Sequence, residues 1–538
     1  MILEVALGIL GLVGLLILRM YYWTKKGKNY WQERGIRVPS YPSMFPMGNA
    51  ITSNFRVLFG RENQSAVAIK QYNELYEDKC YGVYQGADPI LVLKDPEMVK
   101  QFLVKDFPHF VDRSSQKVMD QYLNLDTLED RIWERSLFFR KGDEWKDIRS
   151  TFTPIFTSGK IKGMARLIND ISVKLIDSLD ADARSGQEFD TRVKFGKFSM
   201  DSIASCAFGV DAQSFSNNDT KFVKNAREIF RRKLVDGLKF LGLMIPGGKK
   251  LMGAAGICMT KPENRFFYNI VKTAVEKRKE SNQRRNDLID LMIDAMEDNL
   301  EHEEGQDEGQ FHDDSKLSHK RKTKDFDIMT LCATAFIILV AGYDTTGMTL
   351  GYVAYILATH PEIQDKLRNE VDKSFEENEG KMPKYAAVQE MEYLDMIIYE
   401  TLRRFTPVAA LGRVCTEDYQ VPGYPGVTIK ADSEIHVNAS GMHMDPKIYP
   451  EPEKFIPERF SKEEKAKRHP YAFLAFGQGP RNCIGMRFAL YEAKVALVAM
   501  VRKYRLVKTP KTPEKISCDP QAQLGASLEP LWVRVEER

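Results

Sequence analysis

The chain has 538 residues, of which 43% are hydrophobic and 28% are charged, an ordinary composition for a globular protein. Its formal net charge of only +3 argues against a nucleic-acid-binding protein, in which basic residues are concentrated. The seven cysteines are scattered without a C-x-x-C pair, which favours a reducing compartment over a disulfide framework and provides no zinc knuckle.

The N-terminal segment has the features of a membrane anchor. Residues 1–23, MILEVALGILGLVGLLILRMYYW, are mostly apolar, and Glu4 and Arg19 are their only charges. About 20 such residues span the hydrocarbon core of a bilayer, whereas a secretory signal peptide is shorter and begins with basic residues. Residues 24–48 are basic and then contain several prolines, and positive flanks stay on the cytoplasmic side. We expect an anchor at 1–23, a linker at 24–48 and a cytoplasmic globular part; the alternative for the first segment is a buried core helix.

The remainder of the chain is dominated by helical periodicity. YGVYQGADPILVLKD, residues 81–95, predicts a pair of strands, and residues 417–439 predict another small sheet with Pro-Gly turns. Residues 297–324 are first acidic and then basic and almost lack aromatic residues, which is typical of a mobile solvated loop; a docking tail is the alternative. These patterns predict a mainly α protein with small β-sheets.

The longest helical pattern runs from about residue 325 to Pro361, where the proline ends it. Its apolar flanks indicate burial, yet its centre, FIILVAGYDTTGMTL, contains the small residues Ala341 and Gly342, and then Asp344 and Thr345. A buried carboxylate and a buried hydroxyl need hydrogen-bond partners. Two interpretations therefore stay open: a groove that holds water, or a helix-packing notch with a satisfied aspartate.

One cysteine, Cys483, stands in FGQGPRNCIG, directly before a strong helical pattern. The N–H groups and the dipole of a helix N-terminus stabilise an anion, so we expect this thiol to ionise easily. A single thiolate without a nearby His or Cys cannot complete a zinc site, but it can be the axial ligand of a heme iron.

Gly479 and Gly485 would let the backbone approach a flat macrocycle. Phe476 would pack on its face, and Arg481 would pair with a propionate. The alternatives are a small buried hydrophobe and a cysteine-protease nucleophile, for which no local histidine base is evident.

This stretch resembles the F-x-x-G-x-R-x-C-x-G signature of the cytochrome P450 family, matched by Phe476, Gly479, Arg481, Cys483 and Gly485. Further motifs resemble the family's in the expected order: WKDIR, AGYDTT, ETLR and FIPERF, which begin at residues 145, 341, 400 and 455. The resemblance covers nearly the whole chain and is strongest to the animal microsomal type that oxidises varied lipophilic compounds. It implies one heme-thiolate catalytic domain over residues 49–538. Heme b would lie between the long central helix and the cysteine loop, with Cys483 as axial ligand.

The resemblance also assigns structural and cofactor-binding roles. It implies a heme-propionate site formed by Trp145, Arg149, Arg413, His443 and Arg481. For the lone His443, an ordinary hydrogen-bonded structural role is an equally good alternative. Glu400 and Arg403 lie at i, i+3 on a helix, and with Arg459 they would form a buried ion network that holds the cysteine loop.

Asp344 and Thr345 would deliver protons while oxygen is activated. The resemblance implies a substrate pocket lined by Phe110, Phe138, Ala341, Thr345, Val408, Ala409, Ala410 and Leu528. All except Thr345 are apolar or small, which indicates a hydrophobic substrate. The implied activity is monooxygenation: one atom of O2 is inserted into a lipophilic small molecule such as a xenobiotic, a steroid or a fatty-acid-like compound.

No convincing G-x-G-x-x-G motif is evident, so the electrons would come from a separate protein. The resemblance implies that this protein is NADPH–cytochrome P450 reductase, with cytochrome b5 as a further donor. Candidate basic contacts for it are Arg140, Lys141, Lys146 and Arg487, and a solvated charged face is the alternative. Two other functions stay open: an isomerase or dehydratase that acts on peroxides without a reductase, and a non-catalytic membrane heme protein.

The anchor and the resemblance together imply the endoplasmic reticulum membrane, with the catalytic domain facing the cytoplasm and no nucleic-acid partner. LKFLGLMIPGGKKLMGAAGI, residues 238–257, is similar to the family's membrane-dipping segment. Such a lipid contact would let lipophilic substrates pass from the bilayer to the pocket. A core helix is the alternative for this segment.

Overall fold

The structure is a computed structural model of the chain. It describes residues 11, 14–15, 18, 29–40, 62–85, 88–123, 127–216, 220–230, 239, 248–281, 284–297, 327–519 and 524–538. The predicted anchor at 1–23 and the predicted loop at 297–324 lie almost entirely outside the described residues, as do parts of 24–48 and of 238–257.

The described residues form mainly helices with small sheets, as predicted. The helices are α3 (Gln64–Glu74), α4 (Pro96–Lys100), α5 (Ser114–Tyr122), α6 (Leu128–Glu134), α7 (Gly142–Phe152), α8 (Ser158–Ser185), α9 (Thr191–Ile203), α10 (Lys221–Phe230), α12 (Gly248–Ala254), α13 (Asn264–Ser281), α14 (Leu288–Met296), α15 (Ile328–Thr359), α16 (Pro361–Glu377), α17 (Tyr385–Gln389), α18 (Glu392–Arg404), α19 (Ala439–His443), α20 (Lys462–Lys467) and α21 (Met486–Lys503). The strands are β1 (Cys80–Gln85), β2 (Asp88–Leu93), β3 (Phe189–Asp190), β4 (Leu411–Val414), β5 (Tyr419–Gln420), β6 (Thr428–Ile429), β7 (Glu434–Val437), β8 (Tyr504–Lys508) and β9 (Trp532–Glu537).

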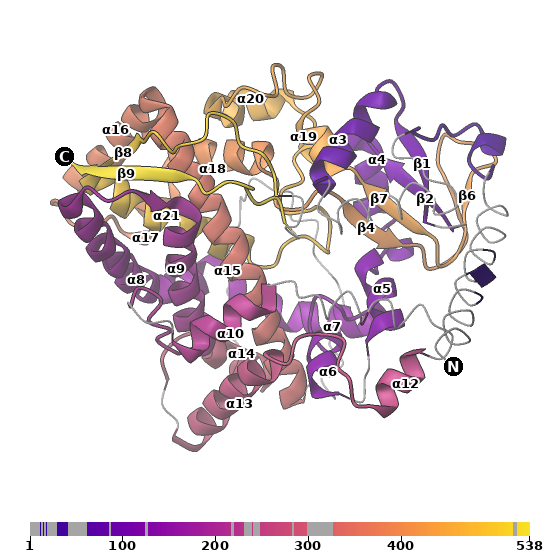
Figure 1. The fold of residues 1–538 in the computed structure, drawn as a ribbon, viewed down its shortest axis with the longest axis horizontal. Helices are drawn as coiled ribbons and strands as arrows, with labels where there is room; N and C mark the ends of the chain where they lie inside the picture. Colours follow the sequence, from indigo (N-terminus) through magenta and orange to yellow (C-terminus); the bar gives the residue numbers. More distant parts are fainter. Residues whose placement is uncertain are drawn as a thin grey trace.

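Among the described residues the strands pair in the orders β1-β2-β7-β4, β3-β9-β8 and β5-β6. β1 and β2 are antiparallel, with Cys80 opposite Leu93, which confirms the strand pair predicted within residues 81–95. The second predicted sheet is only partly right: β5 pairs with β6, but β7 lies parallel to β2 in the first sheet. Figure 1 shows this first sheet at one side of the molecule near α3 and α4, with most of the helices on the other side.

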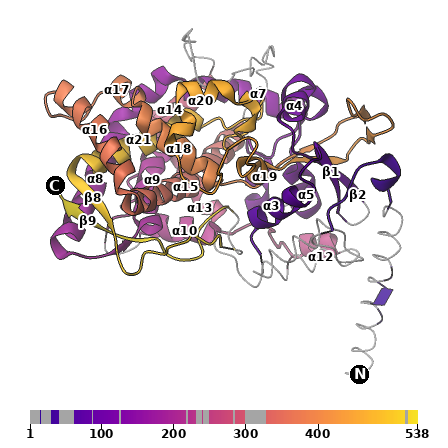
Figure 2. The same cartoon turned by 90° about the horizontal axis from the view of Figure 1, so that it is seen from above.

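α15 runs through the middle of the helical part, where it contacts α9, α18 and α21 (Figures 1 and 2). It begins after Asp327, whose side chain accepts a hydrogen bond from the Thr330 N–H at 2.8 Å, and it ends just before Pro361, as predicted. Its approach to α9 is close enough that a Cβ on Gly347 would lie 2.9 Å from Ser199 Oγ. By length and composition, α15 is the one described helix that could cross a membrane, but half of its most apolar stretch is buried. Its packing identifies it as a core helix.

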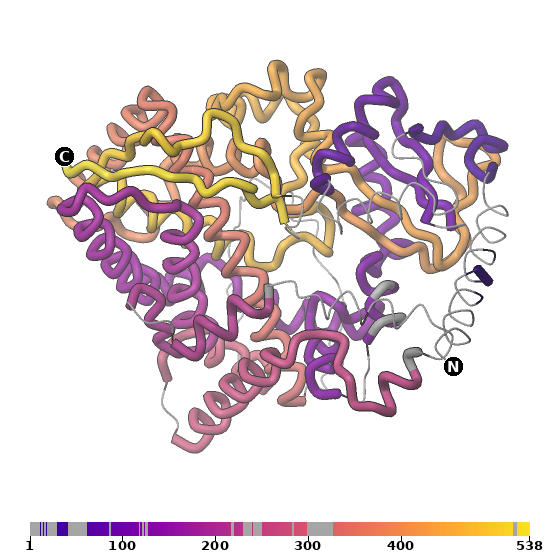
Figure 3. Tube along the Cα trace, in the orientation of Figure 1, coloured from indigo at the N-terminus to yellow at the C-terminus, as the bar shows by residue number. Residues whose placement is uncertain are grey.

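The main hydrophobic core joins segments that are distant in the sequence; Figure 3 shows the C-terminal β8 and β9 beside α8 from the first half of the chain. This core contains one unusual group, the carboxyl of Glu492 on α21. Glu492 is 0% exposed, and neither of its side-chain oxygens has a hydrogen-bond partner of acceptable geometry among the described residues. Burial raises the pKa of Glu492 well above its usual range, and the neighbouring Ser202 hydroxyl offsets this only in part.

We expect Glu492→Gln to remove a pH dependence from the stability of the protein. Because the pKa of Glu492 is higher in the folded than in the unfolded state, its contribution to stability is fully present below the unfolded-state pKa of about 4.3. That contribution is lost as the pH rises towards the folded-state pKa. Glu492→Gln should therefore gain stability relative to the parent as the pH rises above about 4.3, by up to about 1.4 kcal/mol for each pH unit.

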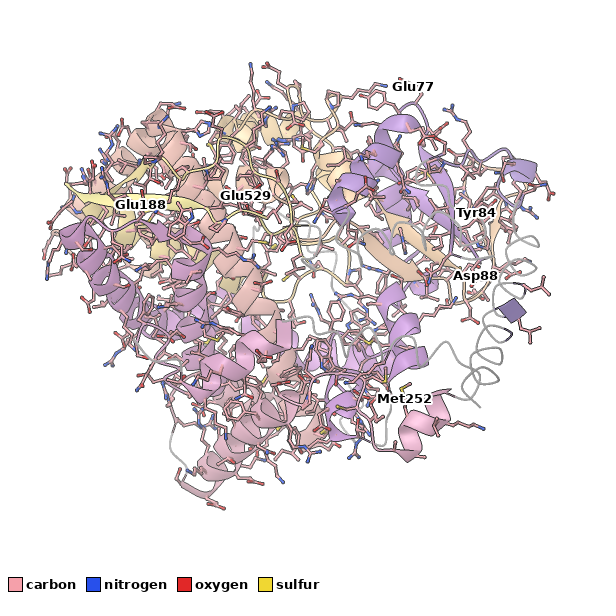
Figure 4. The ribbon with its side chains drawn as sticks, viewed as in Figure 1. Glu77, Tyr84, Asp88, Glu188, Met252 and Glu529 are labelled. Atoms are coloured by element: carbon pink, nitrogen blue, oxygen red, sulfur yellow. The ribbon has the colours of Figure 1, made fainter. Side chains whose placement is uncertain are left out.

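Thermal unfolding of both proteins over a series of pH values, followed by circular dichroism, measures the difference. The matched control is Glu529→Gln at an exposed glutamate (Figure 4), whose stability should follow the parent at every pH. Parallel stability curves for Glu492→Gln and the parent would contradict the prediction.

Candidate active site

The loop that carries Cys483 is closed by a backbone hydrogen bond, because the Cys483 N–H donates to the Phe476 carbonyl at 2.8 Å. Gly479 in this loop has a φ of +71°, and a Cβ there would lie 2.0 Å from the Leu103 carbonyl oxygen. The turn and this protein neighbour therefore require glycine at 479, in place of the predicted approach to a macrocycle. At Gly485, by contrast, a Cβ would meet only one side chain, at 3.9 Å, so protein packing alone does not require glycine there.

The Cys483 side chain is accessible, although many protein groups lie around it. Burial raises the pKa of Cys483, and the Gly485 N–H, Arg149 and Arg113 offset this effect only in part. The prediction that its place before a helix makes this thiol easy to ionise is therefore wrong, because burial outweighs the helix end. A metal ion deprotonates a coordinating thiol outright, so the sulfur is still a suitable ligand.

Four arginines from separate elements gather around this loop: Arg113 before α5, Arg149 on α7, Arg413 on β4 and Arg481 in the loop itself. Arg149 ties α7 to the loop, because its Nη1 and Nη2 donate to the backbone and side-chain oxygens of Asn482 at 3.0 and 2.6 Å. Arg113 Nη2 donates to the Arg481 carbonyl at 3.1 Å. The structure thus brings the predicted arginines together and adds Arg113, which the sequence-based prediction missed.

Arg481 is held by the backbone of two other segments. Its Nε and Nη2 donate to the carbonyls of Val111 and Arg140 at 2.9 and 2.8 Å. Its guanidinium lies 4.0 Å from the centre of the Trp145 ring, which fixes Trp145 beside the loop. Arg413 differs, because its buried Nε has no hydrogen-bond partner among the described residues. Arg413 therefore keeps an unused donor.

Positive charge dominates this region. Burial and the neighbouring arginines lower the pKa of Arg481 to about 7 and that of Arg113 to about 9, and burial lowers the pKa of Arg413 to about 10. Asp112 is near, with its Oδ1 3.5 Å from Arg481 Nη2, and balances only part of the charge. These lowered pKa values mean that the charged guanidinium groups lack counter-charges, and anions beside them would stabilise the charged forms. The two propionates of a heme supply them, so this cluster and the accessible Cys483 sulfur fit a heme.

The centre of α15 is open on one side. The residues that flank it are mostly buried, whereas Ala341 is exposed and Thr345 is half-buried. Thr345 Oγ1 donates back to the Ala341 carbonyl at 2.7 Å, and the helix continues without a break. A Cβ on Gly342 would lie 3.1 Å from Ile203 Cδ1. Gly342 fits the packing notch. The groove that holds water stays a prediction, for which Ala341 and Thr345 provide an accessible face.

Asp344 lies on α15 next to Thr345 and near the solvent-exposed Arg192 of α9. Its Oδ1 is 3.9 Å from Arg192 Nη2, and the Arg192 side chain is 41% exposed. Burial raises the pKa of Asp344, and Arg192 lowers it by less. Asp344 therefore exchanges its proton at a pH closer to neutral than an ordinary aspartate does. This suits a group that passes protons between solvent and the inside of the protein.

Glu400 and Arg403 of α18 form the centre of a buried ion network. Arg403 Nε and Nη2 donate to the two carboxylate oxygens of Glu400 at 2.7 and 2.8 Å, and both side chains are 0% exposed. Arg459 Nε lies 3.3 Å from Glu400 Oε1, and the Ile456 N–H donates to the same oxygen at 2.9 Å. The structure therefore joins the three predicted members and fastens α18 to the 456–459 segment.

His443 belongs to this structural region and not to the arginine cluster. The Leu474 N–H donates to its Nε2 at 2.9 Å, so the proton of the neutral ring is on Nδ1, which donates to Thr406 Oγ1 at 2.7 Å. Burial lowers the pKa of His443 to about 3, so the ring stays neutral. With both nitrogens occupied, His443 has no donor for a propionate. This corrects the implied cofactor contact in favour of its structural alternative.

The predicted pocket residues divide into accessible and buried ones. Phe138, Val408 and Leu528 are 38%, 42% and 54% exposed, which is unusual for such large apolar side chains. Ala341 is also exposed, and Ala410 is half-buried. These five can line a substrate pocket.

Phe110 and Ala409 do not fit the predicted pocket. Phe110 is 0% exposed and packs between Phe102 and Tyr419, with ring centres 5.0 Å away in each case. Ala409 is 6% exposed, and its carbonyl accepts a hydrogen bond from the Ser440 N–H at 3.0 Å. Both are core residues, so their assignment to the pocket wall is corrected.

Comparison with known proteins agrees with this site. Residues 45–531 match the cytochrome P450 family. The chain is 33% identical to cytochrome P450 6B2 of Helicoverpa armigera over 512 residues, 94% of each chain. It is 37% identical to cytochrome P450 3A31 of Mesocricetus auratus over 444 residues, 82% of this chain and 81% of the relative. With the cysteine loop, the arginine cluster and the open central helix, these matches show that the chain belongs to the cytochrome P450 family of heme-thiolate monooxygenases, with Cys483 as the ligand of the iron.

Proposed function

We propose that this monooxygenase oxidises lipophilic small molecules with electrons from NADPH–cytochrome P450 reductase. Cytochrome b5 is proposed as a further donor. An anchor at residues 1–23 and a linker at 24–48 would hold the catalytic domain, residues 49–538, on the cytoplasmic face of the endoplasmic reticulum. The observation that carries the proposal is the accessible Cys483 side chain beside a cluster of buried arginines.

The chain's own residues would bind the cofactor and move protons. The residues proposed to surround the heme are Arg113, Trp145, Arg149, Arg413, Phe476, Arg481 and Gly485. Heme bound through Cys483 supplies the iron at which O2 is reduced. Because Thr345 Oγ1 donates its own hydrogen to the Ala341 carbonyl, its oxygen is left to accept a hydrogen bond from water. Asp344 would pass protons to that water from the solvent near Arg192.

The apolar character of the accessible pocket residues supports a lipophilic substrate. Phe138, Val408 and Leu528 together offer large apolar surfaces that a hydrophobic molecule would cover. The relatives, among them cytochrome P450 9e2 of Blattella germanica (33% identical over 87% of each chain), agree with an animal-type enzyme.

Three of the four basic residues proposed for reductase docking, Arg140, Lys141 and Lys146, already pair with acidic neighbours. Arg140 Nη1 lies 2.7 Å from both Glu134 and Glu144. Lys141 pairs with Asp120, and Lys146 Nζ lies 2.8 Å from Asp143. For each of these residues taken alone, the contacts favour the alternative that it belongs to a solvated charged face and not to a docking site. Because exposed ion pairs contribute only about 0–1 kcal/mol, an acidic partner can still displace the pair of Lys141 and Asp120, whose side chains are 42% and 54% exposed.

The described part of residues 238–257 supports a membrane contact over a core helix. Leu251 on α12 is 74% exposed, and Ile257, after the helix, is 39% exposed. Lys250, also on α12, is exposed as well. Met252 on the same helix lies at the outer edge of the molecule (Figure 4). Exposed apolar residues next to a lysine are typical of a segment that lies in a membrane surface.

The full chain expressed in microsomes tests this proposal. With reductase, NADPH and 7-ethoxycoumarin as the lipophilic probe, we expect an oxygenated product, and the protein should stay in the membrane fraction after a carbonate wash. Conversion of an organic hydroperoxide without reductase, and no oxygenation with it, would favour the isomerase alternative. A ferrous protein that forms no carbon monoxide adduct would favour the non-catalytic one.

A further inference from the structure

We propose that Asp130 on α6 is a clamp that sets the width of the route by which bulky molecules reach the pocket. Asp130 would thus be a positioning residue for substrate selection. This inference rests on the proposed function, because it takes the accessible apolar residues to be the walls of a substrate pocket.

The clamp is a buried carboxylate that binds one short segment. Asp130 is 0% exposed. Its Oδ2 and Oδ1 accept hydrogen bonds from the Met259 N–H at 2.8 and 3.1 Å, and Oδ1 also accepts from the N–H and the hydroxyl of Thr260 at 2.8 and 2.7 Å. Asn264, the first residue of α13, donates to Thr260 Oγ1 at 3.0 Å. One side chain of α6 therefore fixes the connection between α12 and α13.

The C-terminal part of α6 is linked by aromatic contacts to Phe138, one of the proposed pocket residues. Trp133, at the other end of the helix, packs edge-on against Phe336 of α15 with ring centres 5.6 Å apart, and against Phe139 at 5.4 Å. Phe139 in turn contacts the accessible Phe138, with ring centres 4.8 Å apart. A shift of α6 would therefore move Phe138 and change the space next to α15.

The connection between α12 and α13, which Asp130 holds, adjoins apolar side chains that are exposed at the surface. Ile257 is two residues before Met259, and Leu251 is on the preceding α12; both are exposed. The clamp thus joins the pocket wall to the segment that presents apolar side chains outward. Trp133 Nε1, a buried polar group on the same helix, has no hydrogen-bond partner among the described residues. This end of α6 is held by aromatic packing together with local polar contacts, from Ser136 Oγ to the Trp133 carbonyl and from Arg140 to Glu134, both at 2.7 Å. Asp130 is the residue of α6 that binds the backbone of the α12–α13 connection.

Glu129 is a matched neighbour that lacks this role. It also binds the start of α13, because its Oε1 accepts from Arg265 Nε at 2.8 Å. The Glu129 side chain is only 9% exposed, but its partner Arg265 is 57% exposed, so water can solvate the guanidinium, and a glutamine at 129 can still accept one of its hydrogen bonds. Loss of the Asp130 contacts instead leaves the part-buried N–H groups of Met259 and Thr260 without their acceptor and places a polar side chain in the buried position of Asp130.

The experiment compares the association rates of two ligands that bind heme iron through the same imidazole nitrogen but differ in bulk, imidazole and clotrimazole. The purified, heme-loaded full chain is mixed with each ligand, and the shift of the Soret band is followed. Asp130→Asn turns half of the acceptor into a donor and should break the clamp. We expect clotrimazole to associate about tenfold faster and imidazole to change by less than about twofold.

Glu129→Gln is the control and should leave both rates within about twofold of the parent. Thr260→Val removes the hydroxyl that donates to Asp130 and accepts from Asn264, and it should shift the clotrimazole rate by about threefold in the same direction; it keeps the test decisive if Asp130→Asn does not fold. Equal changes for both ligands, or no change in Asp130→Asn and Thr260→Val, would overturn the clamp. Oxidation of 7-ethoxycoumarin by the parent tests the proposed function separately, so failure of one is distinguishable from failure of the other.

Discussion

Glu400→Gln is expected to prevent the protein from accumulating in a folded, heme-loaded form. The substitution leaves Arg403, 0% exposed, beside a neutral amide and removes the carboxylate that Arg459 faces at 3.3 Å. Breaking such a buried pair costs about 3–5 kcal/mol, which is a large part of the 5–15 kcal/mol that typically separates folded from unfolded protein. The measurement is the yield of soluble, heme-containing protein after expression at two temperatures.

The control for this prediction is Arg404→Gln, one residue further along the same helix. Arg404 Nη2 lies 2.6 Å from Glu453, but these side chains are 30% and 73% exposed. An exposed pair contributes at most about 1 kcal/mol, so the yield of this variant should match the parent. Equal yields of Glu400→Gln and Arg404→Gln would show that the buried network does not hold the fold.

Thr345→Ala is expected to separate electron consumption from product formation. In our account Thr345 holds the water that receives protons from Asp344 on the open face of α15. General acid catalysis of this kind contributes at least about a hundredfold to a rate, so product per NADPH should fall by about that factor. NADPH oxidation should continue, with the electrons recovered in hydrogen peroxide. Asp344→Asn should give the same pattern.

Thr349→Ala is the matched control on α15. Its hydroxyl donates to the Thr345 carbonyl at 2.8 Å, the same type of back-bond as that of Thr345, but it is one turn further on. This variant should form product within about twofold of the parent, since the lost hydrogen bond is only a helix-internal one. A parallel loss of product in both threonine variants would assign the effect to the helix and not to proton delivery.

Local patterns in the sequence predicted much of the fold and of the site. The cysteine loop was recognisable because its motif spans ten residues whose spacing the Cys483–Phe476 backbone bond holds fixed. α15 was predictable because a long apolar pattern without proline has few alternatives to a buried helix. The Glu400–Arg403 pair needed only the i, i+3 geometry of one helix.

Other features depend on residues that meet only in three dimensions. Arg113 belongs to no motif, and its significance comes from Arg413 and Arg481, far along the chain. Phe110 and His443 have the residue types expected of a pocket and of a propionate contact, but the direction of a side chain depends on packing that spacing does not specify. The expected acidity of the Cys483 thiol failed for a similar reason, because burial outweighed the helix terminus.

The most direct test of the account is the absorption spectrum of the ferrous carbon monoxide complex of the parent and of Cys483→Ser. A thiolate ligand shifts the Soret band of this complex strongly to the red, so we expect the shifted band in the parent and its loss in the serine variant. Cys258→Ser, at another partly accessible cysteine, should keep it. A Cys483→Ser protein that retained the shifted band and oxidised 7-ethoxycoumarin at the parent rate would contradict the assignment of Cys483 as the iron ligand.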